Sequence, residues 1–144
     1  MFDLLFLFAA TFNKFQAFAE DLPEKVHDLG SDQLVVALTN SVPVAADDQL
    51  SDITEIAYTN CSTRNITTIS STQTAGTYKL LLTDLVLTAS GGTVGPFRYV
   101  VIYNDTSTNN ELVCYYDYGS AITLQDGETF TIDFHATNGL FTLV

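Results

Sequence analysis

The chain has 144 residues, enough for one domain with its own hydrophobic core. It has 17 acidic and five basic residues, which give a formal net charge of −12 at pH 7. Hydrophobic residues make up 47% of the chain. This charge argues against a nucleic-acid partner, because such binding depends on Lys and Arg side chains that neutralise phosphates.

The first residues, MFDLLFLFAATF, contain an apolar run like that of a secretory signal peptide. Asp3 stands where a signal peptide carries positive charge, and Lys14 interrupts the approach to a small-residue cleavage site. The run from Leu4 to Phe12 is also shorter than the roughly 20 residues that span a bilayer. We therefore interpret the start of the chain as an apolar extension and expect no membrane partner.

Residues 12–29 show the three- and four-residue spacing of an amphipathic helix. Pro23 interrupts this pattern, so we expect a kink or restart near Asp21, and we expect Gly30 to end the helix in a left-handed conformation. The sequence thus predicts that residues 1–30 form an extension and a helical arm on a body of residues 31–144. The candidate partner-binding side chains of this arm are Phe12, Phe15, Phe18 and Leu22.

From Gln33 onward the pattern changes to short β-branched and aromatic runs separated by turn residues. The runs cover residues 33–39, 64–70, 77–89, 97–104, 111–118, 121–124, 128–134 and 140–144. So many short strands at near-regular spacing predict a mainly β protein, an antiparallel β-sandwich of jelly-roll-like form with the helical arm at its amino terminus.

Two of these runs make specific predictions about the core. In ETFTIDF, the alternation places Phe130, Ile132 and Phe134 on the core side. In PFRYVVIYND, residues 97–104 read as a central strand that is covered on both faces. One face would carry Phe97, Tyr99, Val101 and Tyr103, and the other Arg98, Val100 and Ile102. We expect one face to meet the opposite sheet and the other to meet the arm helix or a partner.

Turn residues predict the connections. Residues 90–96 and 104–110 read as loops, 125–128 as a hairpin turn, and 137–140 as the turn of the last hairpin. Residues 42–58 contain Pro and paired Asp and read as a long connection across the sandwich.

No pattern in the sequence points to catalysis, a metal or a cofactor, so we expect a protein that is not an enzyme. His27 and His135 lack zinc-ligand spacing with a Cys or a second His, and we assign both to structural or solvent-facing places. A Cys–His pair is conceivable from the counts alone, as Cys114 with His135 or Cys61 with His27. The two cysteines could also form one disulfide, although two separate thiols are favoured.

Two groups of acidic residues are candidate sites. Oxygen ligands for calcium could come from the connection, but the spaced loop of an EF-hand is missing, which favours a solvated acidic segment. The residues concerned are Asp47, Asp48, Asp52 and Glu55. Asp126 and Glu128 could serve as paired glycosidase carboxylates, but their place in a tight hairpin favours turn formation.

The aromatic cluster CYYDYG is the candidate surface for recognition, through Tyr115, Tyr116 and Tyr118. Tyrosine supplies apolar area and a hydroxyl group at interfaces. Ordinary alternation along a strand explains the cluster equally well, so both interpretations stay open.

Several stretches resemble a family of small virion structural proteins of tailed bacteriophages. They include ATFNKF, LSDITEIAYTN, TRNITT, GTYKLLLTDLVLTASGG, GPFRYVVIYNDT and GETFTIDF, and the similarity runs from about residue 10 to residue 144. Members of the family begin near ATFNKF, so MFDLLFLF departs from the pattern.

The resemblance implies a capsid cement, or head-decoration, protein on the capsid exterior of a virion. Such a protein would bind the major capsid protein through its arm and edge loops, act as a homotrimer, and have no catalytic residues. Two other functions are open: a tail or head-tail joining component, and a carbohydrate-binding module that stacks sugars on the three tyrosines.

Overall fold

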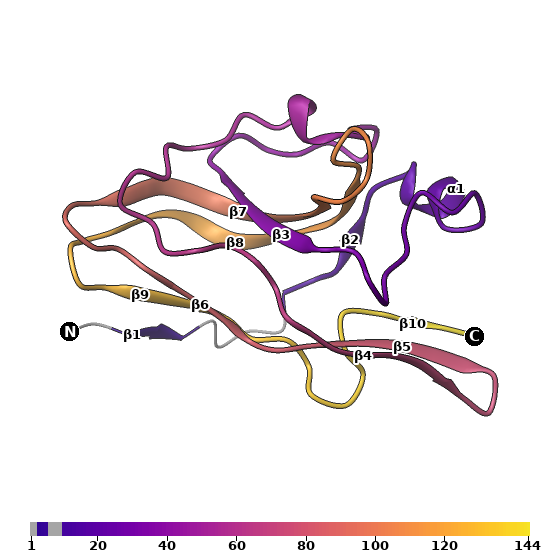
Figure 1. The fold of residues 1–144 in the computed structure, drawn as a ribbon. Coiled ribbons are helices and arrows are strands. Elements are labelled where there is room, and N and C mark those ends of the chain that lie inside the picture. Colours follow the sequence, from indigo (N-terminus) through magenta and orange to yellow (C-terminus); the bar gives the residue numbers. More distant parts are fainter. Residues whose placement is uncertain (1–2, 6–9) are drawn as a thin grey trace.

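The structure, a computed structural model, describes residues 3–5 and 10–144, and for residues 3–5 only the backbone. The protein is mainly β and its sheets are antiparallel apart from one parallel pair (Figure 1). The strands are β1 (Asp3–Leu5), β2 (Asn13–Lys14), β3 (Leu34–Thr39), β4 (Thr68–Thr74), β5 (Thr77–Leu82), β6 (Leu85–Thr88), β7 (Val94–Asn104), β8 (Leu112–Leu124), β9 (Thr129–Ile132) and β10 (Thr142–Leu143). The helical segments are α1 (Phe18–Asp21) and a 3-10 turn at Leu50–Asp52.

The strands form three sheets. The largest has the order β2-β8-β7-β3, and the two smaller sheets have the orders β1-β9-β6 and β10-β5-β4. In Figure 1 the four-stranded sheet lies above the two three-stranded sheets, and the β4–β5 hairpin extends from the lower right. The predicted strands 111–118 and 121–124 are one strand, β8, whereas the predicted run 77–89 divides into β5 and β6 at Thr83–Asp84.

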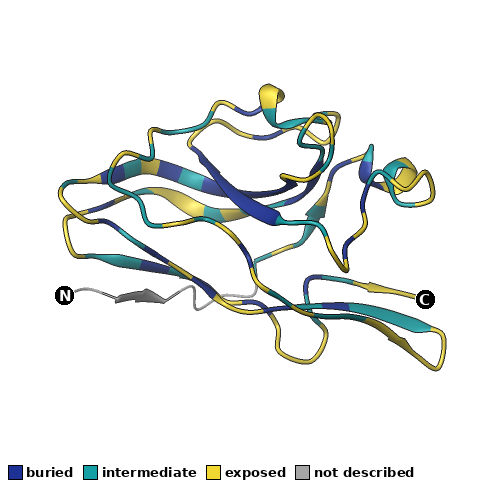
Figure 2. Cartoon of the chain, in the orientation of Figure 1, coloured by how far each residue is buried: buried dark blue, intermediate teal, exposed yellow. Residues whose placement is uncertain are grey.

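One core cluster joins residues from all three sheets. Its members include Val36, Val100 and Ile102 from the large sheet and Leu80, Leu87 and Phe130 from the small ones. The predicted core residues Phe130, Ile132 and Phe134 are all buried, which confirms the alternation in ETFTIDF. Figure 2 shows these buried segments facing each other across the molecule.

A second cluster covers the outer face of the large sheet. Val101 and Tyr103 of β7 pack there against Phe15 and Ile53, with Leu50 at the edge. The strand β7 lies between β8 and β3 and is covered on both faces, as predicted. Its outer face meets the long connection after β3, which supplies Leu50 and Ile53, and the amino-terminal segment, which supplies Phe15.

Phe97 lies on the opposite face from the one that the sequence predicts. It belongs to the core cluster with Val100 and Ile102. The pairing of β7 with β8 shifts between Phe97 and Tyr99. Between these two pairs β7 advances by two residues and β8 by five, so the ladder is irregular here, and strict alternation along β7 cannot anticipate such an irregularity.

The predicted amphipathic helix is wrong for most of its length. Residues 13–14 form strand β2, which pairs with Tyr115 and Cys114 of β8, and the only α-helical turn in this segment is Phe18–Asp21. Gly30 does not end a helix, and the left-handed residue is Lys25, with φ 63°. A three-residue spacing suits a helix, but in an extended chain it sends successive aromatic rings to opposite faces of a sheet. Phe12 and Phe15 do this, because they pack against different clusters.

The last strand pairs differently from the prediction. The turn at residues 137–140 forms, with Gly139 at φ 70°, but β10 pairs with β5 and not with β9. A turn forms at residues 125–128, where the Glu128 amide donates a hydrogen bond to the Gln125 carbonyl. The predicted hairpin is wrong, because β8 and β9 on either side of this turn belong to different sheets and do not pair. The strand β1 runs parallel to β9, and residues 1–2 and 6–9 of the predicted apolar extension lie outside the described residues.

The two cysteines are free thiols. Cys114 is buried within β8 and Cys61 is half-buried beside β6, so no disulfide joins them. Among the described residues, no helix is long and apolar enough to cross a membrane.

Candidate functional site

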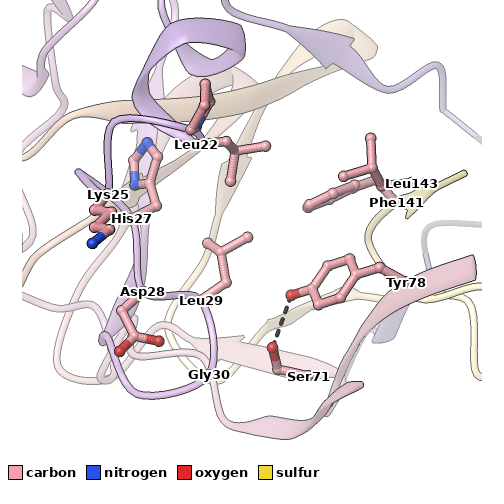
Figure 3. A pocket seen from close by; sticks show the side chains of 11 residues that line it. Leu22, Lys25, His27, Asp28, Leu29, Gly30, Ser71, Tyr78, Phe141 and Leu143 are labelled. Carbon is pink, nitrogen blue, oxygen red and sulfur yellow. Dashed lines mark hydrogen bonds between the residues drawn. The ribbon is translucent and has the colours of Figure 1, made fainter. Parts of the chain in front are cut away.

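A groove of about 680 Å³ lies between the turn segment 22–30 and the inner face of the β10-β5-β4 sheet (Figure 3). One wall carries Leu22 and Leu29, and the other carries Tyr78, Phe141 and Leu143. Figure 3 shows the two sets of side chains pointing toward one another across the opening.

Phe141 is the central ring of the apolar wall. Its centroid lies 5.5 Å from that of Phe18, 5.8 Å from that of Tyr78 and 6.1 Å from that of Phe12. Aromatic contacts at these distances add to the energy of burial and hold rings in defined orientations. The wall is therefore built from three distant parts of the chain, and it depends on β10 staying paired with β5.

Polar groups are few and lie at the edges of the groove. The Ser71 and Tyr78 hydroxyl groups hydrogen-bond to each other at 2.9 Å. A Cβ atom at Gly30 would stand 3.4 Å from Ser71 Oγ, so the turn segment passes close to β4. Lys25 and Asp28 are exposed at the rim. An apolar recess with a small polar edge can accept an aliphatic or aromatic side chain.

His27 fixes the turn segment to the end of β7 through Asn104. The side-chain oxygen Oδ1 of Asn104 accepts hydrogen bonds from the amides of Thr106 and Ser107, so the side-chain nitrogen must face the other way. That nitrogen donates to Asp32 Oδ2 at 2.7 Å and to His27 Nδ1 at 3.1 Å. Because Nδ1 accepts a hydrogen bond, the proton of the neutral imidazole must be on Nε2.

The Nε2 atom of His27 lies 3.8 Å from Asp21 Oδ2, which is too long for a hydrogen bond. Both atoms are buried and have no hydrogen-bond partner among the described residues. Burial lowers the pKa of His27, against the opposing effect of Glu111 and Asp32. Burial also raises the pKa of the Asp21 carboxyl, and the charge of Glu111 acts in the same direction. Burial therefore favours the neutral form of each group.

The candidate metal-binding and catalytic carboxylates accept hydrogen bonds within the protein's own turns and loops. Asp52 accepts the amides of Asp48 and Gln49 at the 3-10 turn, and Glu55 accepts the Tyr58 hydroxyl at 2.6 Å. Asp126 accepts the Gly91 amide at 2.8 Å. Within the described part of the chain, no three His, Cys, Asp or Glu side chains come together as a metal site.

Of the four predicted arm residues, two are unavailable to a partner in this structure. Phe15 and Phe18 have exposed fractions of 0% and 2% and belong to the protein's own clusters. Phe12 and Leu22 are half-buried, and Leu22 lines the groove. The segment packs on its own body because the edge of β8 offers it backbone hydrogen bonds, including one from the Phe15 amide to the Val113 carbonyl.

The three candidate tyrosines do not form one exposed platform. Tyr115 packs against Phe15 at 5.3 Å on the outer face of the sheet. Tyr116 and Tyr118 pack against the core cluster on the inner face, where Tyr118 lies 5.6 Å from Phe130. Burial raises the pKa of Tyr116. Alternation along β8 thus explains the cluster, and the stacking surface that a carbohydrate-binding module needs is missing at these residues.

The groove itself was not predicted. The sequence places Tyr78 and Phe141 in strands and gives neither a functional role. Of the two places that the sequence allows His27, structural or solvent-facing, the buried side chain occupies the structural one. The sequence signal that could have indicated the groove is the pair of large apolar side chains Phe141 and Leu143 in LFTLV. A short edge strand does not need two such side chains for its own packing, so they suggest an apolar surface.

Comparisons with protein-family models, with curated proteins and with solved structures find no match for this chain.

Proposed function

We propose that the protein is a non-enzymatic structural protein of a tailed-phage virion, most specifically a capsid cement or head-decoration protein. It binds the major capsid protein on the outside of the shell. The resemblance of residues 10–144 to virion structural proteins supports this function, and so does a mainly antiparallel β fold. The observation that carries it is the apolar groove, which gives a strongly acidic protein a recess for a partner's side chain.

The architecture belongs to the same proposal. The four-stranded sheet forms one layer of a β-sandwich of jelly-roll-like form, and the two three-stranded sheets form the other. A core cluster that takes residues from all three sheets supports this arrangement. A sandwich leaves its loops and outer edges free for contacts with a shell.

In this function the groove takes an apolar side chain of the major capsid protein. Leu22 and Leu143 flank the opening and Phe141 forms the inner wall. Phe12 and Phe18, predicted as direct contacts, instead support Phe141 from behind. One side chain in one groove binds weakly, but many copies on a lattice give a large avidity.

The function is tested by binding the purified protein to shells of the phage that have been stripped of it. Leu143 is 55% exposed, so Leu143→Asp places a charge at the groove without opening a cavity. Val86 on β6 is 49% exposed and lies outside the groove, so Val86→Asp is a matched control. We expect Leu143→Asp to lose shell binding and Val86→Asp to keep it. Equal binding by both variants would contradict the role of the groove.

A further inference from the structure

The strand β4 presents a long open sheet edge. It is the outer strand of the β10-β5-β4 sheet, and its seven residues, TISSTQT, include neither a charged residue nor a proline. Figure 2 shows most of this strand exposed, and Ile69 has an exposed fraction of 62%. Natural proteins usually protect such edges with charges, prolines or a covering segment, since an open edge pairs with another strand.

The comparable edges of this protein are covered by its own chain. The edge of β3 receives residues 64–66, since the Val36 amide donates to the Arg64 carbonyl and the Ile66 amide to the Leu34 carbonyl. The edge of β6 receives Ser62, which bonds to Thr88 through both its amide and its hydroxyl. Within the described residues, no segment covers β4 in this way.

The hairpin geometry shows which groups of β4 face outward. Ala75 and Gly76, with φ 52° and 84°, form a two-residue turn between Thr74 and Thr77. Residues that flank such a turn form a hydrogen-bonded pair, and pairs alternate from there along the ladder. The backbone N–H and C=O groups of Gln73 and Ser71 therefore point away from β5, toward the open edge.

The charge distribution favours a second copy of this chain as the occupant. Residues 56–83 contain no Asp or Glu, although the whole chain has 17, and they include the basic residues Arg64 and Lys79. Two molecules with a net charge of −12 repel each other when their acidic surfaces meet. The β4–β5 hairpin therefore brings no carboxylate of its own into a contact between two copies.

We propose that β4 pairs antiparallel with β4 of a second copy around a two-fold axis at Thr72. Ser71 of each molecule then forms a hydrogen-bonded pair with Gln73 of the other, which uses the outward groups of both strands. The two Thr72 residues face each other as a non-hydrogen-bonded pair, in which Cα atoms are about 4.5 Å apart. This contact has two-fold symmetry, unlike the three-fold contact of the trimer that the resemblance implies, and it does not depend on the virion role.

The register is tested by oxidative cross-linking of the purified protein in a Cys61→Ser background, which leaves only the buried Cys114. A cysteine at position 72 meets its symmetry mate within the Cα range of a disulfide, about 4.4–6.8 Å. A cysteine at position 74 faces residue 70 of the second copy, about 14 Å from its own mate. We expect Thr72→Cys to give a covalent dimer and Thr74→Cys to stay monomeric. Failure of Thr72→Cys to cross-link, or equal cross-linking by both variants, would overturn the proposal.

A second variant separates strand pairing from random collision. Gln73→Pro removes an N–H that faces the second copy, while its own pairing with Tyr78 lies at a non-hydrogen-bonded position. Added to Thr72→Cys, this change is expected to abolish the covalent dimer, with an unchanged far-UV circular dichroism spectrum showing that the fold is kept. A folded double variant that still cross-links would contradict pairing through β4.

Discussion

At the scale of single residues, Asn104 determines the state of His27. Two backbone amides orient the Asn104 side chain, and its nitrogen then requires His27 Nδ1 to accept a hydrogen bond. A doubly protonated imidazole cannot accept a hydrogen bond, so protonation of His27 would place its Nδ1–H against the N–H of the Asn104 side chain. The charges of Glu111 and Asp32 favour the protonated form of His27, but burial has the larger effect on its pKa.

This arrangement predicts how stability depends on pH. The pKa of His27 in the folded protein lies below its usual value of 6.5. The contribution of the neutral His27 side chain to the free energy of unfolding is therefore fully present above pH 6.5. It is lost as the pH falls through 6.5 toward the folded value, because the unfolded chain takes up the proton first. We expect the free energy of unfolding to fall between about pH 7.5 and about pH 5.5 in the wild type, and to fall less in His27→Gln. Urea denaturation at both pH values measures the difference, and equal losses in the two proteins would contradict it.

Phe15 tests whether the amino-terminal segment belongs to the body. Its ring is fully buried between Tyr115 and the outer cluster, so Phe15→Ala is expected to cost about 3–5 kcal/mol of unfolding free energy. Phe12→Ala, at a half-buried position, is expected to cost less. Chemical denaturation gives both values. An arm that stays free until it meets a partner would show no loss for either variant.

At the scale of elements, the groove depends on the turn that brings β10 to β5. Gly139 has φ 70°, and a Cβ atom there would stand 2.0 Å from the Leu80 carbonyl oxygen. Gly127 has a similar φ of 85°, but a Cβ atom there would meet nothing within 4 Å. The two glycines thus share a backbone conformation and differ in the space around them.

Alanine substitutions at these glycines are therefore a matched pair. Gly127→Ala is expected to cost about 1–2 kcal/mol, the penalty of a left-handed residue. Gly139→Ala is expected to cost more and to release β10, which removes Phe141 and Leu143 from the groove wall. Hydrogen exchange of the amides at residues 140–143 measures the release. Protection that stays unchanged in Gly139→Ala would show that the turn does not hold β10.

The elements that could be predicted are those whose signal is local. Runs such as LVVALT and TFTI form strands because β-branched and aromatic residues suit a pleated, buried surface, and the turn at residues 125–128 follows from its own residues. Pairing is not local. The sequence near β10 suggests a hairpin with β9, whereas the structure pairs it with β5, more than fifty residues earlier in the chain.

The residues of the groove escaped prediction for the same reason. The spacing of Phe12, Phe15 and Phe18 fits a helix and an extended chain equally well, and only the open edge of β8 decides between them. The groove gathers Leu22, Tyr78 and Phe141 from three segments that no pattern along the sequence connects.

At the scale of the whole molecule, the net charge of −12 means that the acidic side chains repel one another within a molecule and between molecules. Salt screens this repulsion, because the Debye length falls from about 30 Å at 0.01 M to about 3 Å at 1 M. We expect the melting temperature to rise and the β4-mediated dimer to strengthen as sodium chloride is added. Thermal unfolding and sedimentation velocity across a salt series measure the two effects, and a dimer that weakens with salt would show that ion pairs hold it together.

The most direct test of the proposed virion function is quantitative mass spectrometry of purified phage particles, with the copies of this chain counted against the major capsid protein. A cement protein is predicted to be present in a ratio near one, or a simple fraction of it, because it follows the shell lattice. A dozen copies or fewer would place the chain at the neck or tail, and its absence from the particle would contradict the virion function altogether.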